Sequence, residues 1–206
     1  CGAPVSVVPY PIPSMDTEKG FELDLECDFN FLIVSQMGPR KNLENSIRWW
    51  VEEFIDQEVG LVLKTNLKNN SIIDYKHVNE NIQEILSKYS HRKCKVYLLH
   101  GDLSSGQMTY LYGHDKIKAI INIAHGEGFG LPLFEAAREG LPIISVGWSG
   151  QVDFLHHNNK DYYTPVEYTI GPIQKSAVWA GVLEEKSQWA YAEQGSYKMK
   201  LREVYK

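Results

Sequence analysis

The sequence of 206 residues is poor in several features that would place it in a special class of protein. No apolar run approaches the ~20 residues that a membrane span requires, so no transmembrane segment is predicted. The formal net charge is −5, which argues against wholesale binding to nucleic acid or to an anionic membrane. The three cysteines (Cys1, Cys27 and Cys94) are far apart and odd in number, a pattern typical of a reducing compartment and not of a disulfide framework. With no signal-peptide pattern either, we expect a cytoplasmic protein.

Several catalytic signatures are absent as well. The glycines at 126, 128 and 130 spell Gly-Glu-Gly-Phe-Gly, which is neither the dinucleotide fingerprint nor a P-loop. There is no Ser-His-Asp order and no nucleophile elbow. The His156-His157 pair has no carboxylate or cysteine at the spacing of metal ligands, so we predict no metal site.

What the sequence does contain is an alternation of strand and helix patterns. Short apolar runs rich in β-branched residues predict strands, and apolar residues at helical spacing predict helices. About five alternations predict an α/β fold, a doubly wound, Rossmann-like parallel sheet with helices on both faces. The predicted strands cover residues 29–35, 59–64, 94–99, 119–124 and 142–146, with a further one over 179–183; the predicted helices cover 42–57, 77–89, 104–112, 133–139, 150–156 and 189–205.

The remaining segments have the composition of loops or linkers. Residues 1–28 contain closely spaced prolines and then a mixed acidic stretch, which predicts an extended linker. Residues 66–74 and 157–176 are polar or mixed and are predicted as loops. Trp49-Trp50 and Phe134 are expected in the core.

Polar residues and glycines follow the predicted strands, and sheets of this kind bind ligands at those carboxyl ends. After residues 119–124, a glycine-rich loop leads to Pro132, which suits a first helical position. Such a loop directs free N–H groups and the positive end of a helix dipole at an anion. Two carboxylates flank it, Glu127 in the loop and Glu135 one turn into the helix, with seven residues between them.

These carboxylates can accept hydrogen bonds from several hydroxyls while the loop N–H groups bind an anion. Hydroxyls together with phosphate describe a nucleotide sugar. Two simpler interpretations stay open at this point. Glu127 could be a loop charge in solvent, and Glu135 could serve only to stabilise the helix dipole.

Three cations are expected near the same edge. Arg40 and Lys41 lie at the start of a predicted helix, where cations oppose the macrodipole at a cost of about a few tenths of a kcal/mol each. A bound anion would reverse that effect. Lys64 ends a predicted strand and could add positive charge. The alternatives are solvated charges on a surface turn for Arg40 and Lys41, and a strand end in water for Lys64. Asp153 could face the cleft or cap a helix.

Residues 125–144 resemble the signature of retaining GT-B glycosyltransferases of the family 4, or group 1, type. That pattern is Glu-Gly-Phe-Gly-Leu-Pro, a second Glu after seven residues, and then Gly-x-Pro before a strand. It is present here as residues 127–132, Glu135 and residues 140–142. Upstream, residues 31–36 followed by Pro39-Arg40-Lys41-Asn42 resemble the family's strand, basic residue and helix start.

The ends of the chain extend this resemblance. Val8-Pro9 resembles the segment that leads into the family's C-terminal domain, and Trp189-Ala190 and Leu201-Arg202 resemble its closing helix. The resemblance therefore implies that residues 1–206 form one donor-binding domain, with a linker over 1–28 and a terminal helix over 185–206. It also implies a partner that is absent here, the N-terminal acceptor-binding domain, through which any peripheral membrane contact would be made. The first residue is Cys1 and not methionine, so we expect a fragment or a processed product.

The resemblance also implies roles for individual residues. Glu127 would lie beside the donor sugar, Glu135 would hold the ribose hydroxyls, and Lys41 would neutralise the diphosphate and help it leave. Amides of the glycine loop would approach sugar and diphosphate, and backbone over 101–103 would meet the base. Glu127 and Lys41 are then catalytic, and the donor-binding residues are Gln36, Arg40, Lys64, Gly101, Asp102, Leu103, Gly126, Gly128, Phe129, Gly130, Leu131 and Glu135.

By the same resemblance, the activity is a hexosyl transfer that retains anomeric configuration and needs neither metal nor cofactor. The nucleoside-diphosphate sugar is a substrate. One position departs from the family, since Gln36 stands where an arginine is usual, and Arg40 or Lys64 would have to supply that charge. We expect this chain alone to bind nucleoside diphosphates weakly and to transfer little sugar. Two alternatives remain, a non-catalytic nucleotide-sugar binding or regulatory module, and another GT-B enzyme such as an epimerase or a phosphorylase.

Overall fold

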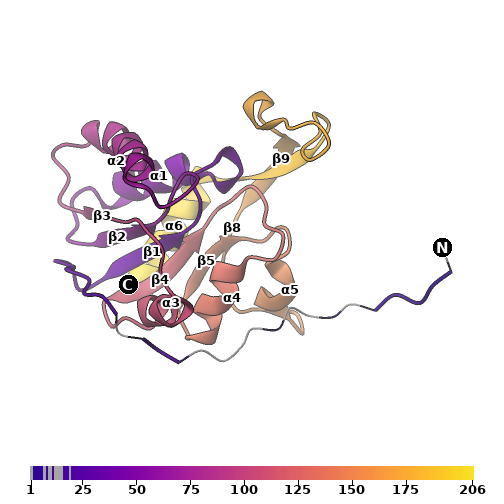
Figure 1. The fold of residues 1–206 in the computed structure, drawn as a ribbon, viewed down its shortest axis with the longest axis horizontal. Helices are drawn as coiled ribbons and strands as arrows, with labels where there is room; N and C mark the ends of the chain where they lie inside the picture. The colour runs from indigo at the N-terminus through magenta and orange to yellow at the C-terminus, as the bar shows by residue number, and fades with distance from the viewer. Residues whose placement is uncertain (1, 7, 9–10, 12–15, 19) are drawn as a thin grey trace.

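The main sheet is parallel throughout. A computed structural model describes residues 2–6, 8, 11, 16–18 and 20–206. Among these residues, six strands form the main sheet in the order β3-β2-β1-β4-β5-β8, and each neighbouring pair is parallel (Figure 1). The strands are β1 (Asn30–Val34), β2 (Gly60–Lys64), β3 (Lys95–Leu99), β4 (Ile117–Asn122), β5 (Ile143–Val146) and β8 (Thr164–Val166).

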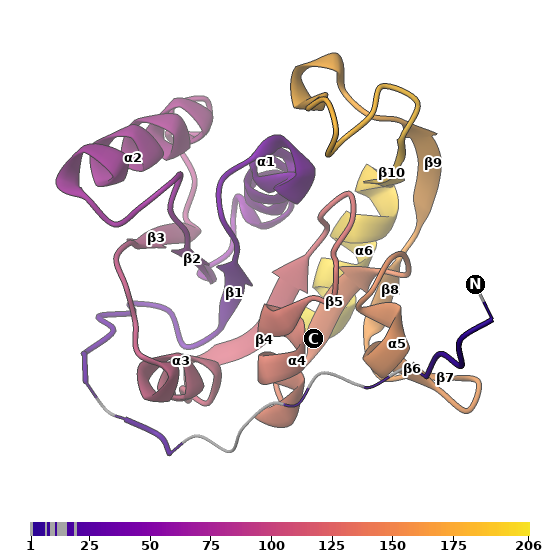
Figure 2. The ribbon, with the colours of Figure 1, turned by 45° about the vertical axis from the view of Figure 1, so that its right-hand side comes forward.

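Helices cover both faces of this sheet (Figure 2). One core packs α1, α2 and α6 against one face, and a second core packs α3, α4 and α5 against the other. The predicted doubly wound, Rossmann-like architecture is therefore confirmed. The helices are α1 (Leu43–Phe54), α2 (Ile72–Ser87), α3 (Ser105–Tyr112), α4 (Leu131–Arg138), α5 (Val152–Leu155) and α6 (Gln194–Tyr205), with short 3₁₀ turns η1 (Pro39–Lys41) and η2 (Lys175–Ala177).

The central strands are apolar along their length because both of their faces are buried. In β1, Phe31 and Ile33 enter the core beneath α1, while Leu32 enters the core beneath α3 and α4. Trp50 of α1 is fully buried and its ring meets Phe31 edge-on, with the centroids 6.2 Å apart. The prediction that Trp50 is a core residue is confirmed.

One helix start differs from the prediction, and the cap of another is made differently. The helix predicted over 77–89 begins at Ile72, because the Ser71 hydroxyl accepts a hydrogen bond from the Asp74 N–H at 3.2 Å and caps the helix there. Asn42 precedes α1, but its side chain does not cap the helix. It donates instead to the Ile123 carbonyl at 3.2 Å. Arg40 and Lys41 therefore lie in η1, ahead of α1 and not in its first turn.

The region after residue 156 contains more strand than was predicted. The segment 157–176 is not simply a loop, because it holds β8 and β9 (Tyr168–Pro172), and a small hairpin joins β6 (His156–His157) to β7 (Lys160–Asp161). Pro165 is tolerated in β8 because this strand lies at the sheet edge. The predicted helix from residue 189 is wrong over its first part, which forms β10 (Gln188–Ala192), antiparallel to β9. The predicted strand over 179–183 is reduced to one bridge between Trp179 and Leu183.

We call β9, β10 and the residues 173–187 between them the arm. The arm projects from the body of the domain, and its turn η2 contacts η1 (Figures 1 and 2). At the other end of the chain, the predicted proline-rich linker lies partly outside the described residues, but Val5 and Val8 within it are exposed.

A substitution in the core tests this packing. We expect Trp50→Ala to lower the free energy of unfolding by about 3–5 kcal/mol, because it removes a fully buried indole and leaves a cavity. Urea titration followed by circular dichroism measures the change. Trp179→Ala is the control, because that side chain is 67% exposed on the arm. Its loss should change the free energy of unfolding by no more than about 0.5 kcal/mol. Equal losses in the two variants would contradict the packing described.

Candidate functional site

The candidate site lies where the strand order reverses. The sheet runs β3-β2-β1 on one side and β4-β5 on the other, so the carboxyl ends of β1 and β4 flank the switch point. Ligands of open α/β sheets bind in the crevice outside such a point. Arg40 and Lys41 follow β1, and Glu127 follows β4.

Glu127 is 8% exposed, and its carboxylate accepts hydrogen bonds from three side chains. Lys41 Nζ lies 2.6 and 2.8 Å from its two oxygens. Arg40 Nη1 lies at 3.1 Å and Asn122 Nδ2 at 3.0 Å. The sequence therefore predicted correctly that Arg40, Lys41 and Glu127 gather at one edge, whereas Asn122 was not singled out.

The environment of Glu127 favours its ionised form. Burial alone raises the pKa of this carboxyl, but the hydrogen bonds from Asn122 and Lys41, together with the Lys41 and Arg40 charges, hold its pKa below the usual value of 4.5. Two cations face one carboxylate, so the group carries an excess of positive charge. That excess can serve an anionic ligand.

Backbone hydrogen bonds join η1 to the glycine loop. The His125 N–H donates to the Arg40 carbonyl at 2.8 Å, and the Arg40 guanidinium donates to the Gly126 carbonyl. His125 is 2% exposed, and its Nδ1 donates to the Ala190 carbonyl of β10 at 2.8 Å. No sequence signal singled out His125, because its role depends on β10, and that segment was predicted as helix.

The loop after β5 supports the glycine loop from its other side. The Ser149 hydroxyl accepts from the Glu127 N–H at 3.0 Å and donates to the Glu127 carbonyl at 2.5 Å. The Gly150 N–H donates to the same carbonyl at 3.0 Å. A Cβ on Gly150 would lie 2.0 Å from the Gly128 carbonyl oxygen, so only glycine fits there. The Gly-Trp-Ser-Gly run at 147–150 was the available signal in the sequence.

The second carboxylate is turned toward α3. Glu135 accepts a hydrogen bond from the Tyr112 hydroxyl at 2.9 Å. Gly130 adopts a left-handed conformation at φ 87°, and α4 begins directly after it at Leu131. The Phe129 ring packs against Phe134 and Phe154, with centroids 5.3 and 5.1 Å away. The glycine loop and the helix start have the predicted form.

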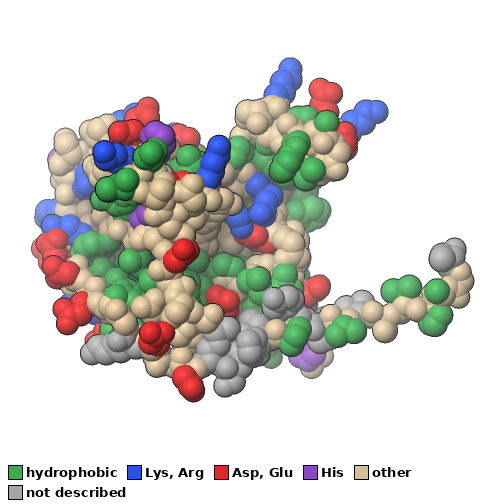
Figure 3. Space-filling view, in the orientation of Figure 1, with side chains coloured by type: hydrophobic (Ala, Val, Ile, Leu, Met, Phe, Trp, Pro, Cys, Tyr) green, Lys and Arg blue, Asp and Glu red, His purple; other side chains and the backbone are tan. Residues whose placement is uncertain are grey.

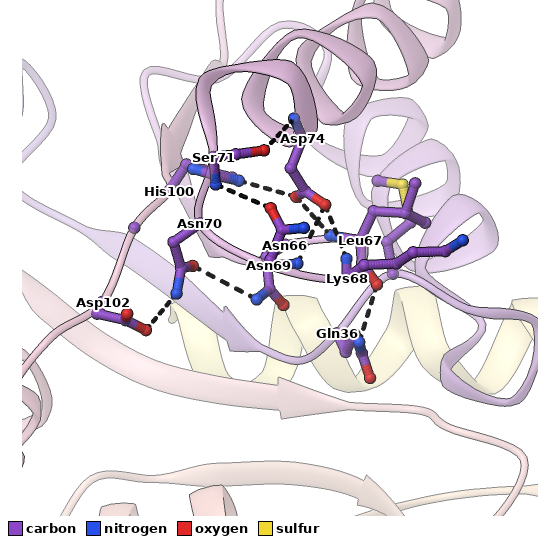
Figure 4. Close-up of polar contacts among 12 residues, drawn as sticks. Gln36, Asn66, Leu67, Lys68, Asn69, Asn70, Ser71, Asp74, His100 and Asp102 are labelled. Carbon is purple, nitrogen blue, oxygen red and sulfur yellow. Dashed lines mark hydrogen bonds and ion pairs between the residues drawn. The ribbon is translucent and has the colours of Figure 1, made fainter.

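Lys64, Gly101 and Asp102 form a separate group at the ends of β2 and β3. Lys64 Nζ donates to the Gly101 carbonyl at 2.6 Å, and burial lowers the pKa of this amine. Asp102 accepts from the Asn70 amide, as Figure 4 shows. The Gln36 amide donates to the Leu67 carbonyl at 2.8 Å, so this side chain is committed to the loop over 66–71 (Figure 4).

Asp74 organises that loop (Figure 4). It is 5% exposed and accepts from the backbone N–H groups of Leu67, Lys68 and Asn69 at 2.9, 2.8 and 3.2 Å. His100 Nε2 lies 2.9 Å from the same carboxylate. Burial opposes ionisation, but these hydrogen bonds hold the pKa of Asp74 well below its usual value. The pair of Asp74 and His100 was not predicted, because residues 66–74 were expected to form a loop.

Among the described residues, no three His, Cys, Asp or Glu side chains gather in a group that could hold a metal ion. In the same part of the chain, no helix has the length and apolar character to cross a membrane.

Solved glycosyltransferase structures share the fold of this chain. The catalytic domain of starch synthase IV from Arabidopsis thaliana, bound to ADP and acarbose, matches 89% of this chain and 32% of its own length, with a TM-score of 0.54 and 13% identity. Pneumococcal O-GlcNAc transferase GtfA, in complex with UDP and GlcNAc, matches 96% and 33%, with a TM-score of 0.48 and 18% identity. The C-terminal domain of LpcC, a group 1 family glycosyl transferase from Francisella tularensis, matches 63% of each chain, with a TM-score of 0.46 and 15% identity.

These comparisons bear on the fold. No protein-family model and no curated protein sequence matches the chain. At 13% identity, the starch synthase match shows that the chain has the Rossmann-like α/β fold found in GT-B glycosyltransferases. The chain spans about a third of the length of that domain and of GtfA.

The pairing of Glu127 predicts how stability depends on pH. The pKa of the Glu127 carboxyl is lower in the folded state than in the unfolded state. The ionised carboxylate therefore adds to the free energy of unfolding above the unfolded-state pKa, and this stabilisation is lost as pH falls through the folded-state pKa. We expect Glu127→Gln to be less stable than the wild type at pH 7, with the gap closing at pH values below 4.5. Urea unfolding across this range measures it. Glu185→Gln, at an exposed position of the arm, should give a constant gap near zero. A gap for Glu127→Gln that does not change with pH would contradict the assignment.

Proposed function

We propose that this chain is the donor-binding half of a retaining glycosyltransferase and binds a nucleoside-diphosphate sugar. The observation that carries the proposal is the excess of positive charge around the carboxylate of Glu127 at the switch point. The shared fold supports it, since the starch synthase IV structure is described as bound to ADP. A second domain then supplies most of the acceptor site.

The chemistry requires these groups. Transfer breaks the bond between the anomeric carbon and the diphosphate oxygen, and the nucleoside diphosphate leaves with the electron pair. The acceptor hydroxyl oxygen forms the new bond to the anomeric carbon on the same face, and its proton passes to the departing diphosphate oxygen. Negative charge grows on the departing diphosphate, and fixed cations such as Lys41 and Arg40, with N–H groups of the glycine loop, stabilise it without a metal.

Glu127 has two tasks in this proposal. It holds Lys41 and Arg40 in one position, which reduces the entropy lost when a diphosphate binds. When the diphosphate takes over part of their hydrogen bonding, the carboxylate oxygens become available to sugar hydroxyls. Glu135 keeps acceptor capacity beyond its bond from Tyr112 and is the proposed partner of the ribose hydroxyls.

The proposed site for the nucleobase is the group formed by Lys64, Gly101 and Asp102 at the ends of β2 and β3. Lys64 fixes the Gly101 carbonyl, and the backbone over 101–103 follows directly. Along the sheet edge, this group, η1 and Glu127 belong to successive strands β3-β2, β1 and β4. A nucleotide sugar laid across them has its base, diphosphate and sugar in the same order.

One observation favours a second candidate, a binding or regulatory module without turnover. Gln36 stands where an arginine is usual, and its amide is committed to the Leu67 carbonyl. It therefore adds no charge near Glu127. The two candidates share the nucleotide site and differ only in sugar transfer once an acceptor domain is supplied.

Thermal denaturation with nucleotides tests the proposal. A ligand that binds only the native state raises the melting temperature. We expect UDP, GDP or ADP, or one of their sugars, to raise it at millimolar concentration, with inorganic phosphate as the control for nonspecific anion effects. If none of the nucleotides or their sugars exceeds the phosphate control, the donor-binding proposal is wrong.

Substitution of Lys41 tests its role separately. We expect Lys41→Ala to weaken binding of the active nucleotide by roughly 10–100-fold, the loss of a hydrogen bond between charged groups. Lys118→Ala removes an exposed lysine of β4 and should leave affinity unchanged. Isothermal titration calorimetry measures both variants.

A double variant separates two explanations of such a loss. If Lys41 only neutralises Glu127, then Lys41→Ala combined with Glu127→Gln should restore nucleotide affinity. If Lys41 contacts the diphosphate, as proposed, the double variant stays weak. Full restoration would refute the direct contact.

A further inference from the structure

Trp148 is an exposed aromatic side chain beside the glycine loop. It follows β5 and is 36% exposed. A Cβ placed on Gly126 would lie 4.0 Å from Trp148 Nε1, so the indole N–H borders the residue whose carbonyl binds Arg40. The indole thus lies beside the glycine loop, next to the group formed by Arg40, Lys41 and Glu127.

The backbone that presents this indole is tightly fixed. Ser149 adopts φ 80°, an uncommon conformation for a residue with a side chain, and its hydroxyl makes two hydrogen bonds to the Glu127 backbone. A Cβ on Gly147 would lie 2.8 Å from the Tyr163 hydroxyl, so this position also favours glycine. Strained backbone that its surroundings enforce is characteristic of ligand-binding segments.

The indole is supported on one side and open on another. The Tyr168 ring lies beside it, with the centroids 6.1 Å apart and the planes at 51°. No hydrogen bond joins the indole N–H to any other described residue. An apolar face next to an unused N–H donor suits a ligand with both C–H and hydroxyl groups. A pyranose ring has this composition, with axial C–H groups on one face and hydroxyls at its rim.

The position along the sheet edge distinguishes the donor sugar from a second sugar. In the proposed function the nucleotide lies over β3, β2 and β1, and the donor sugar lies at Glu127 after β4. Trp148 follows β5, the next strand, which is about 4.8 Å further along the sheet. The ring over Trp148 is therefore the one beyond the reacting anomeric carbon.

A hollow lies where the arm meets the body of the domain (Figure 3). Figure 3 shows acidic and basic side chains close together where the arm and the body join. Tyr168, the support of Trp148, is the first residue of β9 and so the base of the arm. Trp148 is thus in contact with the residue at which the arm begins.

We propose that Trp148 is a stacking platform for a pyranose ring of the acceptor, so that the acceptor is a carbohydrate. The choice of acceptor over donor rests on the proposed function, while the sugar-binding surface itself rests on the geometry of Trp148. The contribution of this chain is then both the donor site and one wall of the acceptor site.

The indole N–H resonances of the five tryptophans test the proposal in a ¹⁵N-labelled protein. Disaccharides of glucose, galactose, mannose and N-acetylglucosamine are titrated to tens of millimolar. We expect at least one to shift the Trp148 resonance in a saturable way. Trp148→Ala should weaken binding of that disaccharide by roughly tenfold, and Trp148→Phe should weaken it by less. Binding to these variants is followed through the backbone amide resonances that the disaccharide shifts. Trp179→Ala, an equally removable indole on the arm, should bind as the wild type does.

Three outcomes would overturn the proposal. No disaccharide shifts Trp148, or binding is unchanged in Trp148→Ala, or a nucleotide sugar displaces the disaccharide from Trp148. The third outcome would show that the ring belongs to the donor. Disaccharide binding that persists beside a saturating nucleoside diphosphate supports the acceptor assignment. Disaccharide binding at Trp148 in a protein that binds no nucleotide would refute the proposed function and leave the sugar-binding surface in place.

Discussion

A buried carboxylate needs partners, and the partners of Glu127 determine much of this edge of the domain. At 8% exposure, an ionised side chain is tolerated only where hydrogen bonds and opposite charge replace its water. Lys41 and Arg40 come from η1 and Asn122 from the end of β4. The glycine loop and η1 must therefore stay together, and the backbone bond from His125 to the Arg40 carbonyl reinforces the same junction. Removal of either cation would leave a buried charge underpaired.

That junction exists because β1 and β4 are neighbours. They are separated by 82 residues of chain between Val34 and Ile117, yet pair directly at the centre of the sheet. The crossover after β3 places β4 on the far side of β1, so two loops leave the sheet at adjacent points and in opposite senses. Strand order, and not local sequence, is what brings Arg40 and Glu127 together. The same order sets the sequence of the proposed subsites along the edge, from Lys64 through η1 to Trp148.

The sequence predicted the parts of the fold whose physical signals are local. Strands of a covered parallel sheet are mostly apolar, and β1 to β5 are short, largely apolar runs, so each lay within a residue or two of its predicted place. The glycine loop and the start of α4 were likewise predictable from Gly130 and Pro132. The helix α2 was predicted too short, since Ser71 and Asp74 looked like loop residues until the cap was seen. The gathering of Arg40, Lys41 and Glu127 followed from the predicted parallel order.

The sequence did not predict structure that depends on distant partners. Trp189 and Ala190 fit a helical pattern, and only pairing with β9 makes them a strand. Because β10 was missed, so was His125, whose ring binds the Ala190 carbonyl. Asp74 and His100 are 26 residues apart, and the orientation of Gln36 toward Leu67 depends on how the 66–71 loop folds. Each of these features needs tertiary coordinates, because the contact that defines it lies on another element.

The proposed donor site contains a competition that bears on turnover. Lys41 Nζ has three N–H donors, and both Glu127 oxygens lie within hydrogen-bond distance of it. A bound diphosphate would accept hydrogen bonds from the same N–H groups. The free energy gained from its attraction to the two cations is then partly offset, because Glu127 loses some of its own hydrogen bonds to them. This offset lowers affinity for substrate and product alike, but it matters most for the product, whose extra negative charge would otherwise hold it on the two cations. When the diphosphate leaves, Glu127 regains its full pairing, which favours release. A carboxylate that positions the cations for binding therefore also limits how tightly the leaving group is retained.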